Sequence, residues 1–258
     1  MVTNALVKTV RSLAEPKGRR REGAFVAEGS KCVMDTLAAF VPLHILATPA
    51  WADAHPLSGD AAAVLRLCGR DRLTEMSSLT LAPDVIAVYR MPQPADFDPD
   101  KARTGLVLAL DRVQDPGNLG TIMRTADWMG VDCIWASRET VDCFNPKTVQ
   151  ASMGAVSRVS VIYGDLPDML GETERSCVAG TFLDGENVYT AALPRHGVVV
   201  MGNEGRGISP EVEACIGRRL TIPSYPAGRP TSESLNVGTA AAIVLAQFRA
   251  RIFQNGQD

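Results

Sequence analysis

The sequence predicts an α/β protein in which helices cover both faces of a mostly parallel sheet. Short apolar runs of four or five residues, typical of buried parallel strands, recur through the second half of the chain. Between them lie glycine-rich turns and segments whose apolar residues follow helical spacing. Strands and helices that alternate in this way build a parallel sheet with helices on both sides. The 258 residues, of which 46% are hydrophobic and 21% charged, suffice for one large domain or two smaller ones.

The first 90 residues predict a small α/β unit of their own. A first helix carries its apolar residues on one face and ends at Pro16. Residues 91–100 are rich in proline and acidic residues and have no period, which is typical of a linker. We therefore expect a first domain at residues 1–95, a linker at 96–104 and a second domain at 105–258. The other elements expected in the first domain are strands at 24–27, 43–47 and 85–89 and helices at 28–40 and 61–68.

Basic side chains gather near the N-terminus. Residues 1–31 carry seven Lys or Arg against three Glu, a net charge of +4 within a chain whose total is −3. Arg19, Arg20 and Arg21 form the densest run. Composition alone favours a solvated loop for this run. The alternative is a patch that contacts phosphates at the entrance of a nucleic-acid site.

Several classes of protein are disfavoured by the composition. The six cysteines form no C-x-x-C pair and the three histidines are scattered, so we expect no metal site and reduced thiols in a cytoplasmic protein. The first thirty residues lack the apolar core of a signal peptide. The apolar run at 240–248 is too short to cross a bilayer, so no membrane partner is expected.

The second domain opens with a strand, a tight turn and a helix between residues 105 and 130. The apolar run at 106–110 predicts a buried strand, and the Asp-Pro-Gly sequence at 115–117 predicts a turn. Either Asp115 or Asn118 caps the helix that follows, and Gly130 ends it.

Two polar residues of this helix, Asn118 and Arg124, fall where an apolar helix does not need them. They are expected at the carboxyl edge of a parallel sheet, where open α/β sheets bind ligands. The remaining elements expected in the second domain are strands at 133–136, 159–162, 177–182, 198–201 and 220–222 and helices at 147–153 and 236–253.

Two further glycine-containing stretches follow apolar strands. In residues 201–211 the glycine spacing is wrong for the dinucleotide fingerprint G-x-G-x-x-G, which disfavours a nicotinamide-dependent enzyme. Turn geometry explains these glycines, but it does not explain Asn203 and Glu204 at the end of a buried strand. In the third stretch, 222–240, Ser234 or Asn236 either caps the last helix or takes part in catalysis, and the residue pattern leaves both roles open.

The residue types in these stretches limit the chemistry. His196 is the only histidine of the second half and no Ser-His-Asp set is visible, while Glu204 has no evident carboxylate partner for hydrolysis. Backbone loops, one Glu, one Arg and several amides suit the binding of a nucleoside-like cofactor and the positioning of a hydroxyl group.

The three stretches together resemble the three motifs of the SpoU (TrmH) family in the SPOUT superfamily, the S-adenosylmethionine-dependent RNA ribose 2′-O-methyltransferases. In this chain, the sequence that resembles the first motif is D-P-G-N-L-G-T-I-M-R-T-A, and the second is V-V-V-M-G-N-E-G-R-G-I-S. The third is I-P with S-L-N-V-G-T-A-A-A-I. The intervening N-P-K-T-V-Q-A-S-M-G-A is also typical. The N-terminal V-K-T-V-R-S-L and F-V-A-E-G-S-K resemble the substrate-binding domain that precedes the catalytic domain in many members.

The resemblance implies a C-terminal parallel-sheet SPOUT domain with a deep trefoil knot. A small α/β ribosomal-protein-like domain that binds the RNA substrate would precede it. The resemblance further implies that S-adenosylmethionine lies in the loops of the knot and that the enzyme is a homodimer whose active site is completed across the interface. The expected substrate is ribosomal or transfer RNA.

Roles for individual residues also follow from the resemblance. The expected catalytic residues are Asn118, Arg124, Glu204, Ser234 and Asn236. The expected cofactor-binding residues are Thr181, Gly185, Gly202, Ile222 and Leu235. The expected RNA-binding residues are Arg19, Arg20, Arg21 and Lys147. One departure from the family pattern is the longer, proline-rich segment between Ile222 and Ser234, at the expected rim of the cofactor site.

Our mechanistic hypothesis gives Arg124 the central role. Asn118 would hold its side chain, while Glu204, Ser234 and Asn236 would fix the geometry of the site. A pKa above about 12 argues against arginine as a general base, so we expect it to stabilise the developing alkoxide while a phosphate receives the proton. The alternative is a catalytically silent RNA-binding homologue that acts in ribosome assembly. Methylation of a small molecule or a protein would leave the N-terminal basic run without a purpose.

Overall fold

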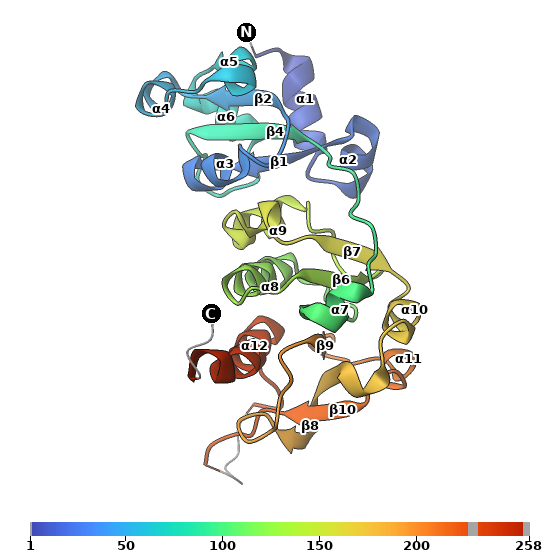
Figure 1. The fold of residues 1–258 in the computed structure, drawn as a ribbon. Coiled ribbons are helices and arrows are strands. Elements are labelled where there is room, and N and C mark those ends of the chain that lie inside the picture. Colours follow the sequence, from blue (N-terminus) through green and yellow to red (C-terminus); the bar gives the residue numbers. More distant parts are fainter. Residues whose placement is uncertain (1, 227–231, 255–258) are drawn as a thin grey trace. The chain divides into compact units, whose positions relative to one another are not determined.

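The structure, a computed structural model, describes residues 2–226 and 232–254, with side chains as far as residue 250. It divides into two compact units (Figure 1). Unit 1 contains Met1–Gln93 together with Asp142–Arg158, and unit 2 contains Pro94–Val141 together with Val159–Asp258. Each unit holds its own sheet, as the sequence predicts for an α/β chain.

Unit 1 is built on a mixed four-stranded sheet with the order β1-β4-β2-β3. Strand β4 is antiparallel to both of its neighbours, and β3 is parallel to β2 at the edge. The strands are β1 (Ala24–Glu28), β2 (Pro42–Ala47), β3 (Leu65–Leu67) and β4 (Val85–Arg90). The helices are α1 (Asn4–Ser12), α2 (Pro16–Glu22), α3 (Ser30–Thr36), α4 (Pro49–Ala54), α5 (Gly59–Ala63), α6 (Arg70–Met76) and α9 (Pro146–Ser152).

Two predictions for unit 1 are wrong. Pro16 begins helix α2, where the sequence suggested a loop. Proline is favoured at the first helical position, because the backbone N–H that it lacks would have no hydrogen-bond partner there. Gly23 ends α2 in the left-handed conformation. The helix expected at 61–68 is the short helix α5 followed by strand β3, because Leu65–Leu67 pair with the edge of β2.

Arg19 is an interior residue of unit 1 and is only 1% exposed. Its guanidinium donates to the Asp142 carboxylate from Nε at 2.9 Å and from Nη2 at 2.7 Å. Nη1 donates to the carbonyl oxygens of Leu13 and Ala14 at 2.9 and 3.0 Å. The structure therefore corrects the RNA-binding role expected for Arg19, because its donors are engaged inside the fold and do not face a phosphate.

The segment Asp142–Arg158 packs against the N-terminal sheet. The ring of Phe144 lies 4.6 Å from that of Phe25 and 6.2 Å from that of Phe40. The thiol of Cys32 faces the carbonyl oxygen of Val149 at 3.7 Å. The chain thus supplies part of the unit 1 core from a segment that follows it by about fifty residues.

Unit 2 is built on a six-stranded, fully parallel sheet with the order β10-β8-β9-β5-β6-β7. Its strands are β5 (Leu106–Leu110), β6 (Cys133–Ser137), β7 (Val161–Gly164), β8 (Val178–Asn187), β9 (Gly197–Met201) and β10 (Arg218–Thr221). Its helices are α7 (Asp100–Thr104), α8 (Pro116–Trp128), α10 (Leu166–Gly171), α11 (Pro210–Glu213) and α12 (Val237–Gln254). Two short 3₁₀ turns lie at Ala155–Ser157, in unit 1, and Arg175–Cys177, in unit 2.

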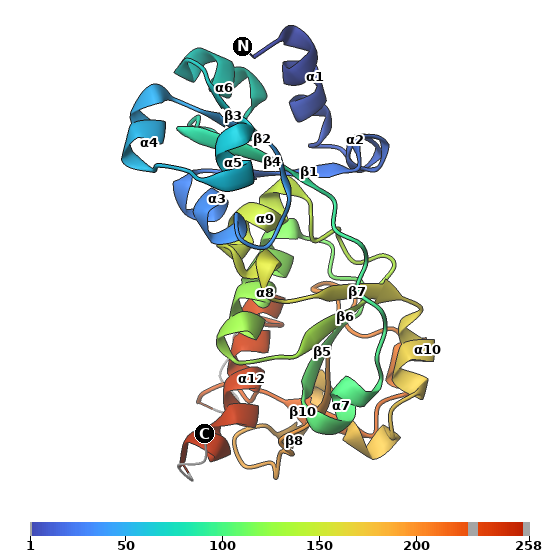
Figure 2. The same ribbon diagram turned by 45° about the horizontal axis from the view of Figure 1, so that its top comes forward.

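Helices cover both faces of the unit 2 sheet (Figure 2). Helices α8 and α12 pack together on one face, and α7, α10 and α11 lie on the other. The predicted strand at 106–110 matches β5, and the predicted strand at 177–182 extends to Asn187. No helix within the described residues is long and apolar enough to cross a membrane. The same residues contain no cluster of His, Cys, Asp or Glu that could hold a metal ion.

The buried ion pair of unit 1 leads to a prediction about stability. Replacing Asp142 with Asn leaves the buried Arg19 guanidinium without a counter-charge. We expect the free energy of unfolding to fall by about 1–3 kcal/mol, less than for a fully buried pair because the Asp142 side chain is 38% exposed. Urea and thermal unfolding of the full chain would measure the change.

The matched control is Glu22→Gln, which removes the partner of the exposed Arg21. This substitution should change stability by less than about 0.5 kcal/mol. Equal effects of the two substitutions would show that the Arg19–Asp142 pair does not stabilise unit 1.

Candidate functional site

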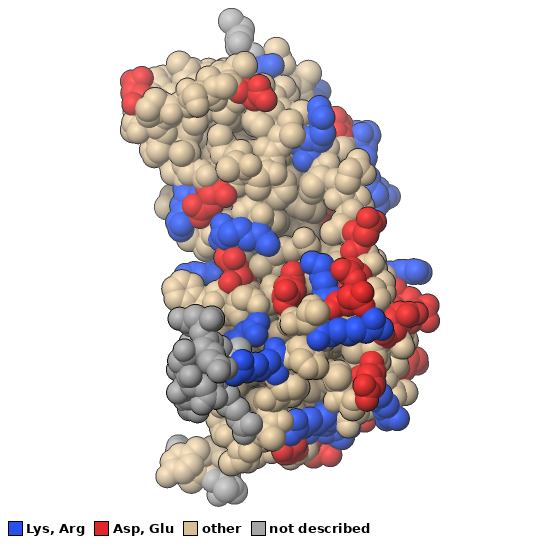
Figure 3. Space-filling view, in the orientation of Figure 1, with Lys and Arg blue, Asp and Glu red and all other residues tan. Residues whose placement is uncertain are grey.

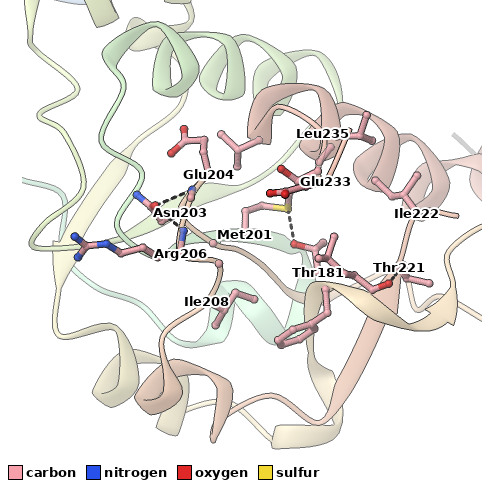
Figure 4. Close-up of a pocket in the computed structure, with 18 of the residues that line it drawn as sticks. Thr181, Met201, Asn203, Glu204, Arg206, Ile208, Thr221, Ile222, Glu233 and Leu235 are labelled. Carbon is pink, nitrogen blue, oxygen red and sulfur yellow. Dashed lines mark hydrogen bonds between the residues drawn. The ribbon is translucent and has the colours of Figure 1, made fainter. Parts of the chain in front are cut away.

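A cavity of about 600 Å³ lies in unit 2 beside β8, β9 and β10, on one side of the sheet (Figure 4). In a parallel sheet the carboxyl ends of the strands meet at one edge, and the loops that leave them surround a common space. The cavity is lined by the ends of β8, β9 and β10, by the loop after β9 and by the first residues of α12. Its size is that of a site for a small organic ligand.

Helix α8 begins beside this cavity. The Asp115 carboxylate accepts a hydrogen bond from the Asn118 backbone N–H at 2.8 Å, and Pro116 occupies the first helical position. Of the two capping residues that the sequence allowed, Asp115 is therefore the N-cap. This leaves the Asn118 side chain available for contacts outside its own helix.

The Asn118 side chain joins the three motif stretches. Its amide nitrogen donates to Oε1 of Glu204 at 2.6 Å, and its amide oxygen accepts from Nδ2 of Asn236 at 2.8 Å. The Asn236 amide oxygen in turn accepts the backbone N–H groups of Gly238 and Thr239, at 3.0 and 3.2 Å. Asn236 thus caps α12, which confirms the first of the two roles that the sequence left open, and it also belongs to this network. Its part in catalysis stays a prediction.

The loop after β9 is closed by Asn203. Its amide oxygen accepts the backbone N–H groups of Gly205 and Arg206 at 3.0 and 3.1 Å, and its amide nitrogen donates to the Arg112 carbonyl oxygen at 2.8 Å. A Cβ atom on Gly202 would lie 2.4 Å from the carbonyl carbon of Gly207, so the loop folds too closely over this position for any side chain. These contacts fix the backbone that carries Glu204.

Asp111 is a structural residue of the site that the sequence analysis missed. It follows β5 directly, is 2% exposed, and its carboxylate accepts the Ser209 backbone N–H at 2.6 Å. Its own N–H donates to the Met201 carbonyl oxygen at 2.9 Å. The signal that could have revealed it is a carboxylate immediately after a continuous apolar strand.

The cavity brings together most of the residues expected to bind the cofactor. Thr181, Gly202, Ile222 and Leu235 line it, together with Glu204 and Ser234 of the expected catalytic set. Gly185 does not line it. A Cβ atom on Gly185 would lie 2.8 Å from the Arg219 carbonyl oxygen, so this glycine instead permits the close approach of β8 and β10.

Arg124 is exposed on helix α8 and forms no hydrogen bond or ion pair with any described residue. The expected contact between Asn118 and Arg124 is absent, because both polar atoms of the Asn118 side chain are bound to Glu204 and Asn236. Arg124 follows Asn118 by six residues on the helix, so the two side chains leave the helix axis in directions about 120° apart. Lys147 lies in unit 1, exposed on helix α9.

The described lining of the cavity is acidic. Asp184, Glu204, Glu213 and Glu233 contribute carboxylates, and Arg206 contributes a guanidinium. Arg219 binds Asp184 at 2.6 Å and also binds Glu213. The hydrogen bond from Arg219 lowers the pKa of Asp184 and raises that of Arg219 itself, so both stay charged near neutral pH. The walls are otherwise apolar, at Met201, Ile208, Ile222, Leu235 and Val237.

Such a cavity suits a ligand that combines apolar surface with positive charge. The Asn118–Glu204–Asn236 network lies at its edge and holds three loops in a fixed relation. Hydrogen bonds, backbone groups and charge are the means that the described residues offer at this edge.

Comparisons with known proteins identify the family. Residues 105–246 match the model of the SpoU rRNA Methylase family, and residues 4–84 match the MRM3-like substrate binding domain. The chain therefore belongs to the SpoU methylase family.

Relatives of known name or structure share nearly the whole length of the chain. The chain is 30% identical over 253 residues to the 23S rRNA (guanosine(2553)-2′-O)-methyltransferase RlmP of Bacillus subtilis, covering 95% of this chain and 96% of that protein. The structure of a putative RNA methyltransferase of the TrmH family from Porphyromonas gingivalis matches with a TM-score of 0.86 and 40% identity, over 97% of this chain and 99% of that one. The AdoMet-bound rRNA methyltransferase of Sinorhizobium meliloti matches with a TM-score of 0.82 and 28% identity, over 98% and 97%.

Proposed function

We propose that the chain transfers a methyl group from S-adenosylmethionine to a ribose 2′-hydroxyl of ribosomal or transfer RNA. The observation that carries the proposal is the hydrogen-bonded network of Asn118, Glu204 and Asn236, which joins the three motifs of the SpoU family at the edge of one cavity. A relative with full-length coverage is named as an rRNA 2′-O-methyltransferase, and a relative of known structure binds AdoMet.

The cavity fits S-adenosylmethionine in volume and in chemistry. Its apolar walls suit an adenosine, and its acidic lining suits a ligand that carries a sulfonium and an ammonium group. Thr181, Gly202, Ile222 and Leu235 are the residues that would hold it. When bound, this cofactor supplies a methyl group attached to a positively charged sulfur, which a hydroxyl oxygen can attack in line.

The residues of the chain divide the remaining tasks. Asn118 and Asn236 fix the position of Glu204, and Ser234 lies beside them on the cavity wall. Arg124 would contact a phosphate and the 2′-oxygen of the target nucleotide and stabilise the developing negative charge. A guanidinium has no acceptor atom and does not take up a proton, so the proton of the hydroxyl passes to another acceptor, for which the RNA phosphate is our candidate.

The alternative, a catalytically silent RNA-binding homologue, is less well supported. A silent binder has no need to keep an asparagine, a glutamate and a second asparagine hydrogen-bonded beside a cavity of cofactor size. Methylation of a small molecule or a protein is also less well supported, because residues 4–84 match the MRM3-like substrate binding domain and a relative of the same length is named as a 23S rRNA methyltransferase.

We further propose that the C-terminal segment forms the trefoil knot typical of the family. Support for the knot comes from the match of residues 105–246 to the SpoU family. We also propose that residues 1–95 bind RNA, with a linker at 96–104 and a catalytic domain at 105–258 whose segment Asp142–Arg158 packs in unit 1. The six cysteines form no disulfide with one another, which supports a cytoplasmic location.

An exposed face of helix α8 supports a homodimer. Trp128 is 86% exposed on this helix, one turn beyond Arg124. A large aromatic side chain in water is typical of a protein–protein interface. Since Arg124 shares this face and does not reach its own Asn118, we propose that the dimer brings Arg124 to the cavity of the partner.

A basic surface on unit 1 supports RNA binding. Blue side chains of Lys and Arg gather beside helices α1 and α2 in Figure 3. The exposed basic residues of these helices are Lys8, Arg11, Lys17, Arg20 and Arg21. With Arg19 buried, we propose Arg20 and Arg21 as the phosphate contacts of the original run, and Lys147 as a further one.

The mechanism predicts the effect of removing Arg124. Arg124→Ala should lower the rate of methyl transfer to RNA at least about 100-fold, because the developing charge loses its stabilising group. The affinity for S-adenosylmethionine should change less than threefold, since Arg124 does not line the cavity. Tritiated methyl transfer and calorimetric titration would measure the two quantities, with Arg124→Lys as an intermediate variant. Turnover at the wild-type rate in Arg124→Ala would refute the role.

The RNA surface predicts a change in salt dependence. Replacing Arg20 and Arg21 with Ala should weaken RNA binding and reduce the slope of log Kd against log salt concentration by about 1 to 2. The control is Arg70→Ala with Arg103→Ala, which removes two exposed charges that pair with aspartates outside this surface. Equal slopes for the wild type and the Arg20/Arg21 variant would assign these residues to an ordinary solvated surface.

The dimer predicts the effect of charging its exposed aromatic residue. Trp128→Glu should convert the chain from dimer to monomer in light scattering coupled to gel filtration, because a carboxylate would be buried in the interface. Leu81→Glu, at an equally exposed apolar residue of unit 1, should leave the mass unchanged. A dimeric Trp128→Glu variant would exclude this face as the interface.

A further inference from the structure

Glu233 differs from the other carboxylates of the cavity because no described residue binds it. Asp184 and Glu213 share the guanidinium of Arg219, and Glu204 accepts the amide of Asn118. Figure 4 shows the Glu233 side chain directed into the cavity. Among the described residues, therefore, none compensates its negative charge at the place where a ligand would lie.

The backbone near Glu233 is held in place. Asn236, three residues further along the chain, is anchored to Asn118 and caps helix α12. The neighbouring walls of the cavity are apolar, at Met201, Leu235 and Val237. A carboxylate beside apolar walls attracts a cation and gains little from a neutral ligand of the same shape.

We propose that Glu233 makes the site discriminate between the sulfonium cofactor and its thioether product. This inference rests on the proposed function. The two ligands, S-adenosylmethionine and S-adenosylhomocysteine, share the adenosine, the ammonium and the carboxylate groups, and they differ by one methyl group and one positive charge. A carboxylate of the cavity wall placed near the sulfur would therefore stabilise the first ligand and contribute little to the second.

The discrimination has a consequence for turnover. Methyl transfer removes the positive charge from the sulfur, so the attraction to Glu233 is lost once the reaction is complete. The product then leaves more readily, and the next molecule of cofactor is bound in preference to it.

The test is a set of binding titrations with the full chain and the two ligands. Glu233→Gln should weaken S-adenosylmethionine about three- to fivefold, the range for a charge pair in contact with water, and change S-adenosylhomocysteine less than twofold. The preference of the wild type for the charged ligand should decrease with salt, and that dependence should be reduced in the variant. Thermal unfolding would establish that the variant folds, as expected for an exposed side chain.

Glu211→Gln is the matched control. It removes the same charge from an exposed position on helix α11 that does not line the cavity, so the ratio of the two affinities should remain that of the wild type. An equal loss for both ligands in Glu233→Gln would assign Glu233 to the shared ammonium group and overturn the inference. An unchanged ratio with unchanged affinities would also overturn it. A wild-type chain that binds neither ligand would instead refute the proposed function itself.

Discussion

The side chain of Asn118 is the contact on which the site depends. Its two polar atoms bind Glu204 and Asn236, which come from loops 86 and 118 residues further along the chain. An amide suits this position because it offers a donor and an acceptor at once, and a carboxylate would repel Glu204. Asp115 caps helix α8 and so frees Asn118 for this task. The geometry of three motifs is thus set by one residue at the start of one helix.

The remaining contacts of the site hold the frame around that residue. Asp111 and Asn203 bind backbone groups of the loop after β9, and Asn203 also lines the cavity. Arg219 neutralises two carboxylates on one wall. The result is a cavity in which most of the polar groups are already paired, so the few unpaired charges determine which ligands are favoured.

Local patterns predicted much of the fold. The continuous apolar runs identified β5 and β9 closely, because strands buried on both faces contain little else. Helix α2 was missed because proline both ends and begins helices, and strand β3 was missed because three residues are too few to show alternation. The motif residues Asn118, Glu204 and Asn236 were identified together by resemblance, but their bonds to one another depend on the sheet order, which no local pattern contains. The burial of Arg19 could not be predicted, because its partner lies 123 residues away.

Unit 1 is made of two separate segments of the chain, and this affects the order in which the protein folds during synthesis. A ribosome releases the chain from its N-terminus, and a domain made of one continuous segment can fold as soon as that segment emerges. Unit 1 must wait, because the counter-ion of Arg19 and the ring that packs on Phe25 lie in Asp142–Arg158. By then β5, α8 and β6 have already left the ribosome. The two units therefore mature in overlapping periods, and a nascent chain that stops before residue 142 exposes an incomplete apolar core to chaperones.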